Sequence, residues 1–236
     1  MKVHYSQLDL FQQCPVAYKR RYIDGIQDPE KSSALEYGQA IHLAIKTHFE
    51  GGDGLETFNM YWNSLKNVEM KYYRHGWDEL RNLANTSFLP NFFRLHAKYY
   101  VNPKMEELCE SPLLPLELSL EGTFDMCSEY KGELTMSDWK TSTKEYKKDK
   151  IRKSPQLWIY AYMYQQKYGV LPKNVQYKIF RKDSGSIQTL EIPITQEELD
   201  RQMESVRRTI KLLLHTIENN LWFHHYDCWC NLEGEK

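Results

Sequence analysis

The stretch from residue 116 to residue 140 constrains the fold most, because apolar and polar residues alternate along much of it. A period of two places successive side chains on opposite faces of a sheet, and it therefore predicts β-strands. Lys131-Gly132 fits a hairpin turn between the last two strands. The predicted strands cover residues 116–121, 122–128 and 133–140.

Helical periodicity dominates the residues before this stretch. A short helix is predicted over 5–13 and an amphipathic one over 34–49, which ends at Gly51-Gly52. Two more predicted helices, over 55–75 and 77–100, are rich in Leu, Phe, Tyr and Trp. We expect residues 52–112 to form a helical subdomain, inserted into a single domain that spans residues 1–236.

The residues after the predicted hairpin return to mixed secondary structure. A helix over 155–168 is followed by strands over 174–182 and 187–193 and by a charged helix from Gln196 to about Leu221. The order is helices, three strands, a helix, two strands and a helix. It predicts an α/β fold with a mixed central β-sheet flanked by helices.

Composition limits the classes of function. The net charge is −1, which argues against broad electrostatic coating of nucleic acid, although local charge placement counts for more than the total. No apolar leader and no run of about 20 apolar residues stands out, so we expect neither export nor a membrane partner. Five cysteines without export indicate reduced thiols and a cytoplasmic location.

Two carboxylates and a lysine mark the strands as a candidate site. Asp138 and Lys140 share a strand face, with Trp139 on the other, and Asp125 lies on the preceding strand, with Phe124 and Met126 on its other face. If the strands pair, both carboxylates can converge on one Mg²⁺ or Mn²⁺ ion, beside which Lys140 can act on water or on phosphoryl oxygens. An isolated Asp-x-Lys is more often a solvent-facing ion pair.

The predicted helix after the hairpin adds polar groups. Ser154 fits an N-cap and Pro155 a first helical position, and Gln156 and Tyr160 stand one turn apart. Near a helix N-terminus, these side chains can contact a phosphate, although a polar helix edge explains them equally well. Upstream, His42 lies one turn after Gly38, and by itself it is better explained as a packed or surface histidine.

A basic segment lies between the carboxylates and this helix. Residues 140–153 hold seven basic and two acidic residues in a chain of net charge −1. Such a run is usually a solvated loop, but here a polyanion would have to pass it. The candidate nucleic-acid contacts beyond Lys140 are Lys144, Lys147, Lys148, Lys150, Arg152 and Lys153.

The ordered set of these residues resembles the RecB-like branch of the PD-(D/E)XK nuclease superfamily. The opening residues Tyr5 to Leu8, followed by Cys14-Pro15 and Tyr18, also match the way such domains begin. The resemblance spans most of the chain and is weakest over 52–112. The motif residues that carry it are Gly38, His42, Gly122, Asp125, Asp138, Lys140, Gln156 and Tyr160.

The resemblance implies roles for these residues. His42, Asp125 and Asp138, with the backbone carbonyl of Trp139, are expected to bind Mg²⁺ or Mn²⁺. Lys140 is expected to be catalytic, together with the two aspartates, and Gln156 and Tyr160 to support the site.

Some relatives in this branch carry an iron–sulfur cluster on one cysteine near the N-terminus and three near the C-terminus. Cys14, Cys228 and Cys230 match three positions, but no fourth cysteine follows Cys230. His224 or His225 is a conceivable substitute, and zinc is a weaker alternative. We expect a member without a cluster.

The sequence and the resemblance together predict a metal-dependent DNA exonuclease that hydrolyses phosphodiester bonds, with single-stranded ends preferred. An endonuclease of the same fold and a non-catalytic nucleic-acid-binding scaffold are the alternatives. A redox or sensing module is weaker still. The chain has no Gly-x-x-x-x-Gly-Lys-Ser/Thr motor motif, so any motor would come from a partner such as a helicase or a recombination protein.

Overall fold

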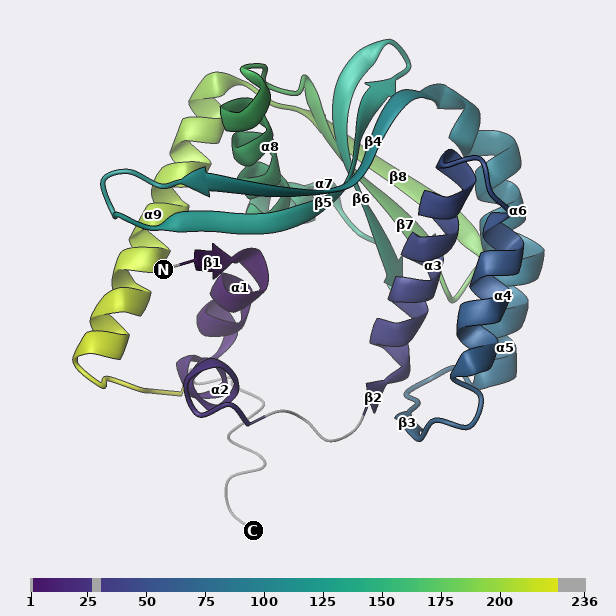
Figure 1. Cartoon of the computed structure of the whole chain (residues 1–236), viewed down its shortest axis with the longest axis horizontal. Helices are drawn as coiled ribbons and strands as arrows, with labels where there is room; N and C mark the ends of the chain where they lie inside the picture. The colour runs from purple at the N-terminus through teal and green to yellow at the C-terminus, as the bar shows by residue number, and fades with distance from the viewer. Residues whose placement is uncertain (1, 27–30, 225–236) are drawn as a thin grey trace.

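The computed structural model describes residues 2–26 and 31–224. Its centre is a six-stranded mixed β-sheet with helices on both faces (Figure 1), as the sequence predicts. The strands of this sheet are β1 (Lys2–His4), β4 (Tyr100–Pro112), β5 (Ser119–Tyr130), β6 (Glu133–Ser142), β7 (Asn174–Arg181) and β8 (Ser186–Pro193). A separate pair consists of β2 (Lys31–Ser32) and β3 (Met70–Lys71).

Helices lie on both sides of the sheet (Figure 1). One group consists of α1 (Tyr5–Gln13), α2 (Pro15–Tyr18), α7 (Lys148–Lys153), α8 (Pro155–Tyr168) and α9 (Gln196–Glu218). The other consists of α3 (Ser33–Phe49), α4 (Gly54–Ser64), α5 (Trp77–Leu83) and α6 (Leu89–Asn91). Among the described residues, no helix is both long enough and apolar enough to cross a membrane.

Each face of the sheet buries its own hydrophobic core. Leu157, Ile159 and Val206 belong to the core under α8 and α9, while Trp62, Phe92 and Trp139 belong to the core under α3 to α6. The alternation of side chains along β6 explains this division, because Met136 joins the first core and Trp139 the second. The sheet is therefore buried on both sides, and a polar group at its centre must find a partner inside the protein.

Strand β5 pairs with three other strands of the sheet. Along one edge it pairs antiparallel with β4, and along the other it pairs with β1 at residues 119–121 and with β6 at residues 126–130. The β5–β6 ladder ends where Met126 faces Ser137. Asp125 and Asp138 are therefore the first residues beyond the point at which the two strands separate.

The strand boundaries differ from the sequence prediction in two places. Residues 100–112, expected in a helical subdomain over 52–112, form β4, and the helical part ends at Tyr99. The predicted strands 116–121 and 122–128 are wrong as separate elements, because Ser119–Tyr130 is continuous. The hairpin is confirmed, with Lys131 and Gly132 at φ of 52° and 87°.

The helical prediction also needs correction. The helix expected over 55–75 ends at Ser64, and the one expected over 77–100 is interrupted by π-helical turns at Ala84–Phe88 and Phe92–His96. The basic segment, expected as a loop, contains the short helix α7. Ser154 occupies the N-cap position of α8, but its hydroxyl accepts a hydrogen bond from Tyr177 instead of capping the helix.

The contact between α3 and α4 gives a test of the helical packing. A Cβ at Gly54 would lie 2.4 Å from the Ala44 carbonyl oxygen and 2.6 Å from Phe93 Cζ. Gly54→Ala should therefore lower the free energy of unfolding by about 1–3 kcal/mol, measured by urea denaturation. Gly76→Ala is the matched control, because nothing lies within 4 Å of its Cβ position, and it should cost less than about 1 kcal/mol for the weaker cap. Equal losses in the two variants would contradict this packing.

Candidate active site

A cleft opens at the point where β5 and β6 separate. Along one edge of β5, β1 pairs with residues 119–121 and β6 pairs with residues 126–130. Among the described residues, Gly122 to Asp125 have no strand partner on that edge. A cavity of about 740 Å³ lies there. Its walls come from β1, α1, β5, β6, α7, α8 and β7, and they include Lys140, Gln156 and Tyr160.

His42 and Asp125 tie the helical layer to the end of β6. Asp125 Oδ2 accepts a hydrogen bond of 2.7 Å from the backbone amide of Trp139, and Asp125 Oδ1 lies 3.3 Å from His42 Nδ1. His42 Nε2 lies 2.9 Å from the carbonyl oxygen of Trp139. Because both ring nitrogens face acceptors, the imidazole in this arrangement is doubly protonated and donates to each.

Asp138 begins a series of polar contacts that leads to Lys140, Gln156 and Tyr160 in the cleft wall. Lys140 Nζ lies 2.7 Å from Asp138 Oδ2 and donates to Gln156 Oε1 at 2.8 Å. Gln156 Nε2 in turn donates to the Tyr160 hydroxyl at 3.3 Å. The Asp138 side chain is only 1% exposed, and its Oδ2 sits outside good hydrogen-bond geometry although it is paired with Lys140.

Burial and neighbouring charges shift the pKa values of this cluster. Burial raises the pKa of Asp138 to about 6, against the opposing effect of Lys140. Burial lowers the pKa of His42, but the charge and hydrogen bond of Asp125 outweigh it and raise that pKa to about 9. For Asp125, burial is outweighed by the charge of His42, which holds the carboxyl pKa below its usual range. The pKa of Lys140 is raised, because its carboxylate neighbours outweigh burial.

Two glycines of the predicted motif have different surroundings. A Cβ at Gly122 would lie 3.0 Å from Tyr160 Cε1, so glycine lets the tyrosine ring pack directly against β5. At Gly38, one turn before His42, nothing lies within 4 Å of a Cβ position. A side chain at Gly38 would therefore meet open space.

The donor set of the site suits a hard divalent ion. Carboxylate and carbonyl oxygens are the ligands that Mg²⁺ and Mn²⁺ prefer, and Asp125, Asp138 and the Trp139 carbonyl supply them here. In the described chain, no three His, Cys, Asp or Glu side chains already surround a common point. His42 and Lys140 instead neutralise the two carboxylates, so a metal would have to exchange places with these cations.

The structure brings together part of the predicted set. The predicted site residues form two groups of polar contacts that meet where Asp138 and Trp139 follow each other on β6. One group holds His42, Asp125 and the Trp139 backbone, and the other holds Asp138, Lys140, Gln156 and Tyr160. Phe124 and Met126, expected together on the face opposite Asp125, lie in different hydrophobic cores.

The basic residues divide into two groups. Lys150 and Lys153 line the cleft, and Arg152 pairs with Glu198 at 3.4 Å. Lys144, Lys147 and Lys148 are exposed outside the cleft lining.

Several aromatic residues of the cleft are absent from the sequence-based set. Tyr5, Tyr146 and Tyr177 line it. Tyr5 belongs to the opening motif and Tyr177 lies within the continuously buried part of β7, but neither pattern distinguishes a cleft residue from a core residue. Only the tertiary arrangement identifies them.

The cysteine positions bear on the iron–sulfur expectation. Cys14 is buried at the N-cap of α2, accepts a hydrogen bond from the Ala17 amide and lies 4.0 Å from His224 Nδ1. Cys109 and Cys127 are buried on β4 and β5. His225, Cys228 and Cys230 lie outside the described residues.

Comparison with solved structures supports the fold. A candidate exonuclease from Eubacterium rectale aligns with a TM-score of 0.66 and 16% identity, over 99% of this chain and 88% of that one. The protein SSO0001 aligns with a TM-score of 0.41 and 16% identity, over 89% of this chain and 76% of that one, which is too weak to add to the argument. No curated protein matches the sequence.

The family comparison covers nearly the whole chain. The model of the PD-(D/E)XK nuclease superfamily matches residues 3–231, a range that includes every residue of the cluster described above. The chain belongs to the PD-(D/E)XK nuclease superfamily.

Proposed function

We propose that this protein is a divalent-metal-dependent DNA exonuclease that hydrolyses phosphodiester bonds at single-stranded ends. The observation that carries the proposal is the series of contacts from Asp138 through Lys140 and Gln156 to Tyr160, the last three of which line the cleft. A cavity of about 740 Å³ has the size of a small-molecule pocket. Such a space suits the end of a flexible strand better than an intact duplex.

The metal site would use four groups of this chain. Asp125, Asp138, the Trp139 carbonyl and a deprotonated His42 would hold Mg²⁺ or Mn²⁺. The bound ion would supply a Lewis acid and an activated water. The contacts of these residues support this set, since Asp125 and the Trp139 carbonyl both lie beside His42, and Asp138 is paired with Lys140.

The remaining residues would act on the phosphate. Lys140, held between Asp138 and Gln156, would orient the water and stabilise charge that develops on phosphoryl oxygens. Gln156 and Tyr160, near the N-terminus of α8, would hold the lysine and contact the phosphate. Lys150 and Lys153 would guide the strand into the cleft.

An end-labelled cleavage assay tests the proposal. Linear single-stranded, linear duplex and closed circular DNA are incubated with Mg²⁺, Mn²⁺ or EDTA. We expect metal-dependent loss of linear DNA, with the circles spared and the label position giving the polarity. Cut circles would show an endonuclease, and tight binding without cleavage would show a scaffold.

Variants of the cluster test the assignment of residues. Asp138→Asn and Lys140→Ala should reduce cleavage at least 100-fold, because each removes a charge at the reacting phosphate, while DNA binding is largely kept. Asp200→Asn, an exposed change on α9, is the matched control and should leave the rate unchanged. Wild-type cleavage by either cluster variant would refute the assignment.

The raised pKa of His42 predicts a pH-dependent metal affinity. Below about pH 9 the imidazole must lose a proton to bind metal, so affinity should rise by up to about tenfold per pH unit between pH 7 and 9. The increase in Tm caused by Mg²⁺ should grow accordingly. Without metal, the stability of the protein should instead fall with rising pH, because the stability that protonated His42 contributes is lost as pH rises through about 9.

The control for this experiment is His42→Gln, which removes the titrating group. Its Mg²⁺-induced shift in Tm should be smaller and nearly constant between pH 7 and 9. A wild-type affinity that does not change over this range would argue against His42 as a ligand.

A further inference from the structure

Tyr146 forms part of the cleft wall without belonging to the catalytic cluster. It lines the same cavity as Lys140 and Tyr160. Its ring meets that of Tyr177 edge-on, with centroids 6.3 Å apart and planes at 87°. Lys150 Nζ lies 3.5 Å from the centre of the Tyr146 ring. The cleft therefore holds a half-buried aromatic ring that is covered by a flexible cation.

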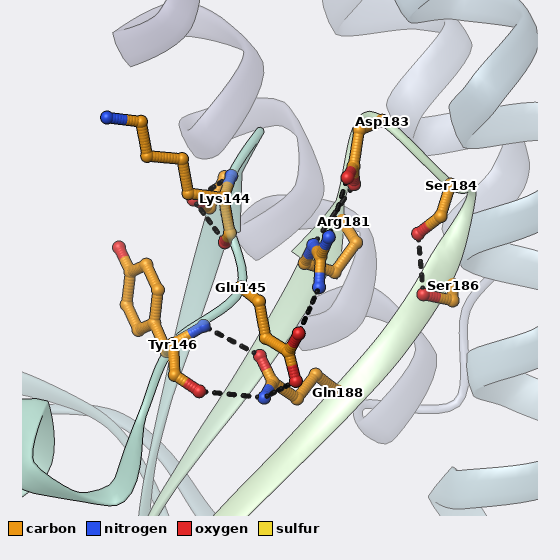
Figure 2. Close-up of polar contacts among 9 residues, drawn as sticks. Lys144, Glu145, Tyr146, Arg181, Asp183, Ser184, Ser186 and Gln188 are labelled. Carbon is orange, nitrogen blue, oxygen red and sulfur yellow. Dashed lines mark hydrogen bonds and ion pairs between the residues drawn. The ribbon is translucent and has the colours of Figure 1, made fainter.

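The backbone of Tyr146 is held at two points by one side chain (Figure 2). The Tyr146 amide donates to Gln188 Oε1 at 3.0 Å, and Gln188 Nε2 donates to the Tyr146 carbonyl oxygen at 2.8 Å. This pair of bonds ties the segment after β6 to strand β8, as an additional strand pairing would do. The position of the ring is thus set by the sheet.

An ion-pair group supports the neighbouring residue. Arg181 binds Asp183 through Nε at 3.0 Å and Nη2 at 2.6 Å, and its Nη1 lies 3.8 Å from Glu145 (Figure 2). Glu145 Oε1 also accepts from Gln188 Nε2 at 3.4 Å. The exposed residue before Tyr146 is therefore anchored to the same hairpin of β7 and β8.

We propose that Tyr146 is a stacking platform for one nucleobase of the DNA strand, and that Gln188 is the residue that positions it. As the base enters, Lys150 moves from the ring to a phosphate of the same strand. The exchange replaces a cation–π contact with base stacking and a charge contact. This inference rests on the proposed nuclease function and adds a contact that recognises a base regardless of its identity.

The chemistry of the surroundings favours a nucleobase as the ligand. The cleft offers both aromatic rings, Tyr146 and Tyr177, and cationic side chains, Lys140, Lys150 and Lys153. Rings beside cations are the combination that binds single-stranded nucleic acid, because bases stack while phosphates are neutralised.

The test uses single-stranded oligonucleotides that carry one abasic residue at each of the first four positions from either end. In the wild type, one position should raise KM about tenfold or more, with kcat changed less than about twofold, as expected for loss of one stacked base (about 1.4 kcal/mol). Tyr146→Ala should raise KM for the intact strand and abolish the difference in KM between the intact strand and the strand that is abasic at the sensitive position. Tyr146→Phe should keep that difference. Gln188→Ala should weaken it.

Matched variants separate these effects from general damage. Tyr73→Ala removes an exposed tyrosine outside the cleft lining. Ser186→Ala changes a residue on the same strand as Gln188 and removes its hydrogen bond to Ser184 (Figure 2). Both should behave as the wild type. Equal KM values at every position, or discrimination that persists in Tyr146→Ala, would overturn the proposal.

A binding readout distinguishes this inference from the nuclease function. In EDTA, 2-aminopurine at the sensitive position should be quenched on binding to the wild type and to Tyr146→Phe, but not to Tyr146→Ala. Quenching without hydrolysis in metal would preserve the stacking platform and refute the exonuclease. Hydrolysis without position dependence would support the exonuclease and refute the stacking platform. The absence of both binding and hydrolysis would refute both proposals.

Discussion

The separation of β5 from β6 beyond Met126 and Ser137 is the constraint on which the site depends. A continuous ladder would occupy the edge groups of both strands and fill the space between them. Instead, the Asp125 carboxylate takes the Trp139 amide that a neighbouring strand would otherwise bind. One side chain thus satisfies a backbone amide of β6 just beyond the last β5–β6 pair and places a carboxylate beside it. The cleft, the cluster and the exposed side of β5 all follow from this break.

Charge balance is the second requirement of the site. Two carboxylates beside each other inside a protein repel and lose hydration, so they need compensating cations. His42 from α3 and Lys140 from β6 provide them, one on each aspartate. The compensation comes from opposite sides of the sheet, which explains why the helical layer has to pack closely on β6. An ion that enters the site takes over a balance that the protein already maintains.

The sequence predicts the elements whose patterns are local. Alternation identifies β6 and places Asp138 and Lys140 on one face, and Pro155 identifies the start of α8. The sequence does not predict strand β4, because Pro103 lies within it and Pro112 ends it. Asn102 and Glu106 also have positive φ, which is unusual in a strand. Residues 116–128 are predicted as two strands divided at Gly122, but this glycine lies within the continuous strand β5 and allows Tyr160 to pack against it.

The site is predictable to a similar extent. The carboxylates and the lysine follow from strand periodicity, and the resemblance to a known superfamily adds His42, Gln156 and Tyr160. The contact of His42 with the Trp139 carbonyl depends on how α3 packs on the sheet, and no local pattern encodes it. The same holds for Tyr146, whose place depends on Gln188, 42 residues later in the chain.

The wide spacing of the site residues along the chain has a consequence for folding. Strand β1 pairs with residues 119–121, and α7 and α8 lie between the parallel strands β6 and β7 in the chain. Such long-range pairings form late, because loop closure must precede the contacts that stabilise it. During synthesis, the two carboxylates therefore emerge from the ribosome before the strand and helix that complete their surroundings. The cleft forms only when nearly the whole domain is in place, so partly folded chains lack the assembled site.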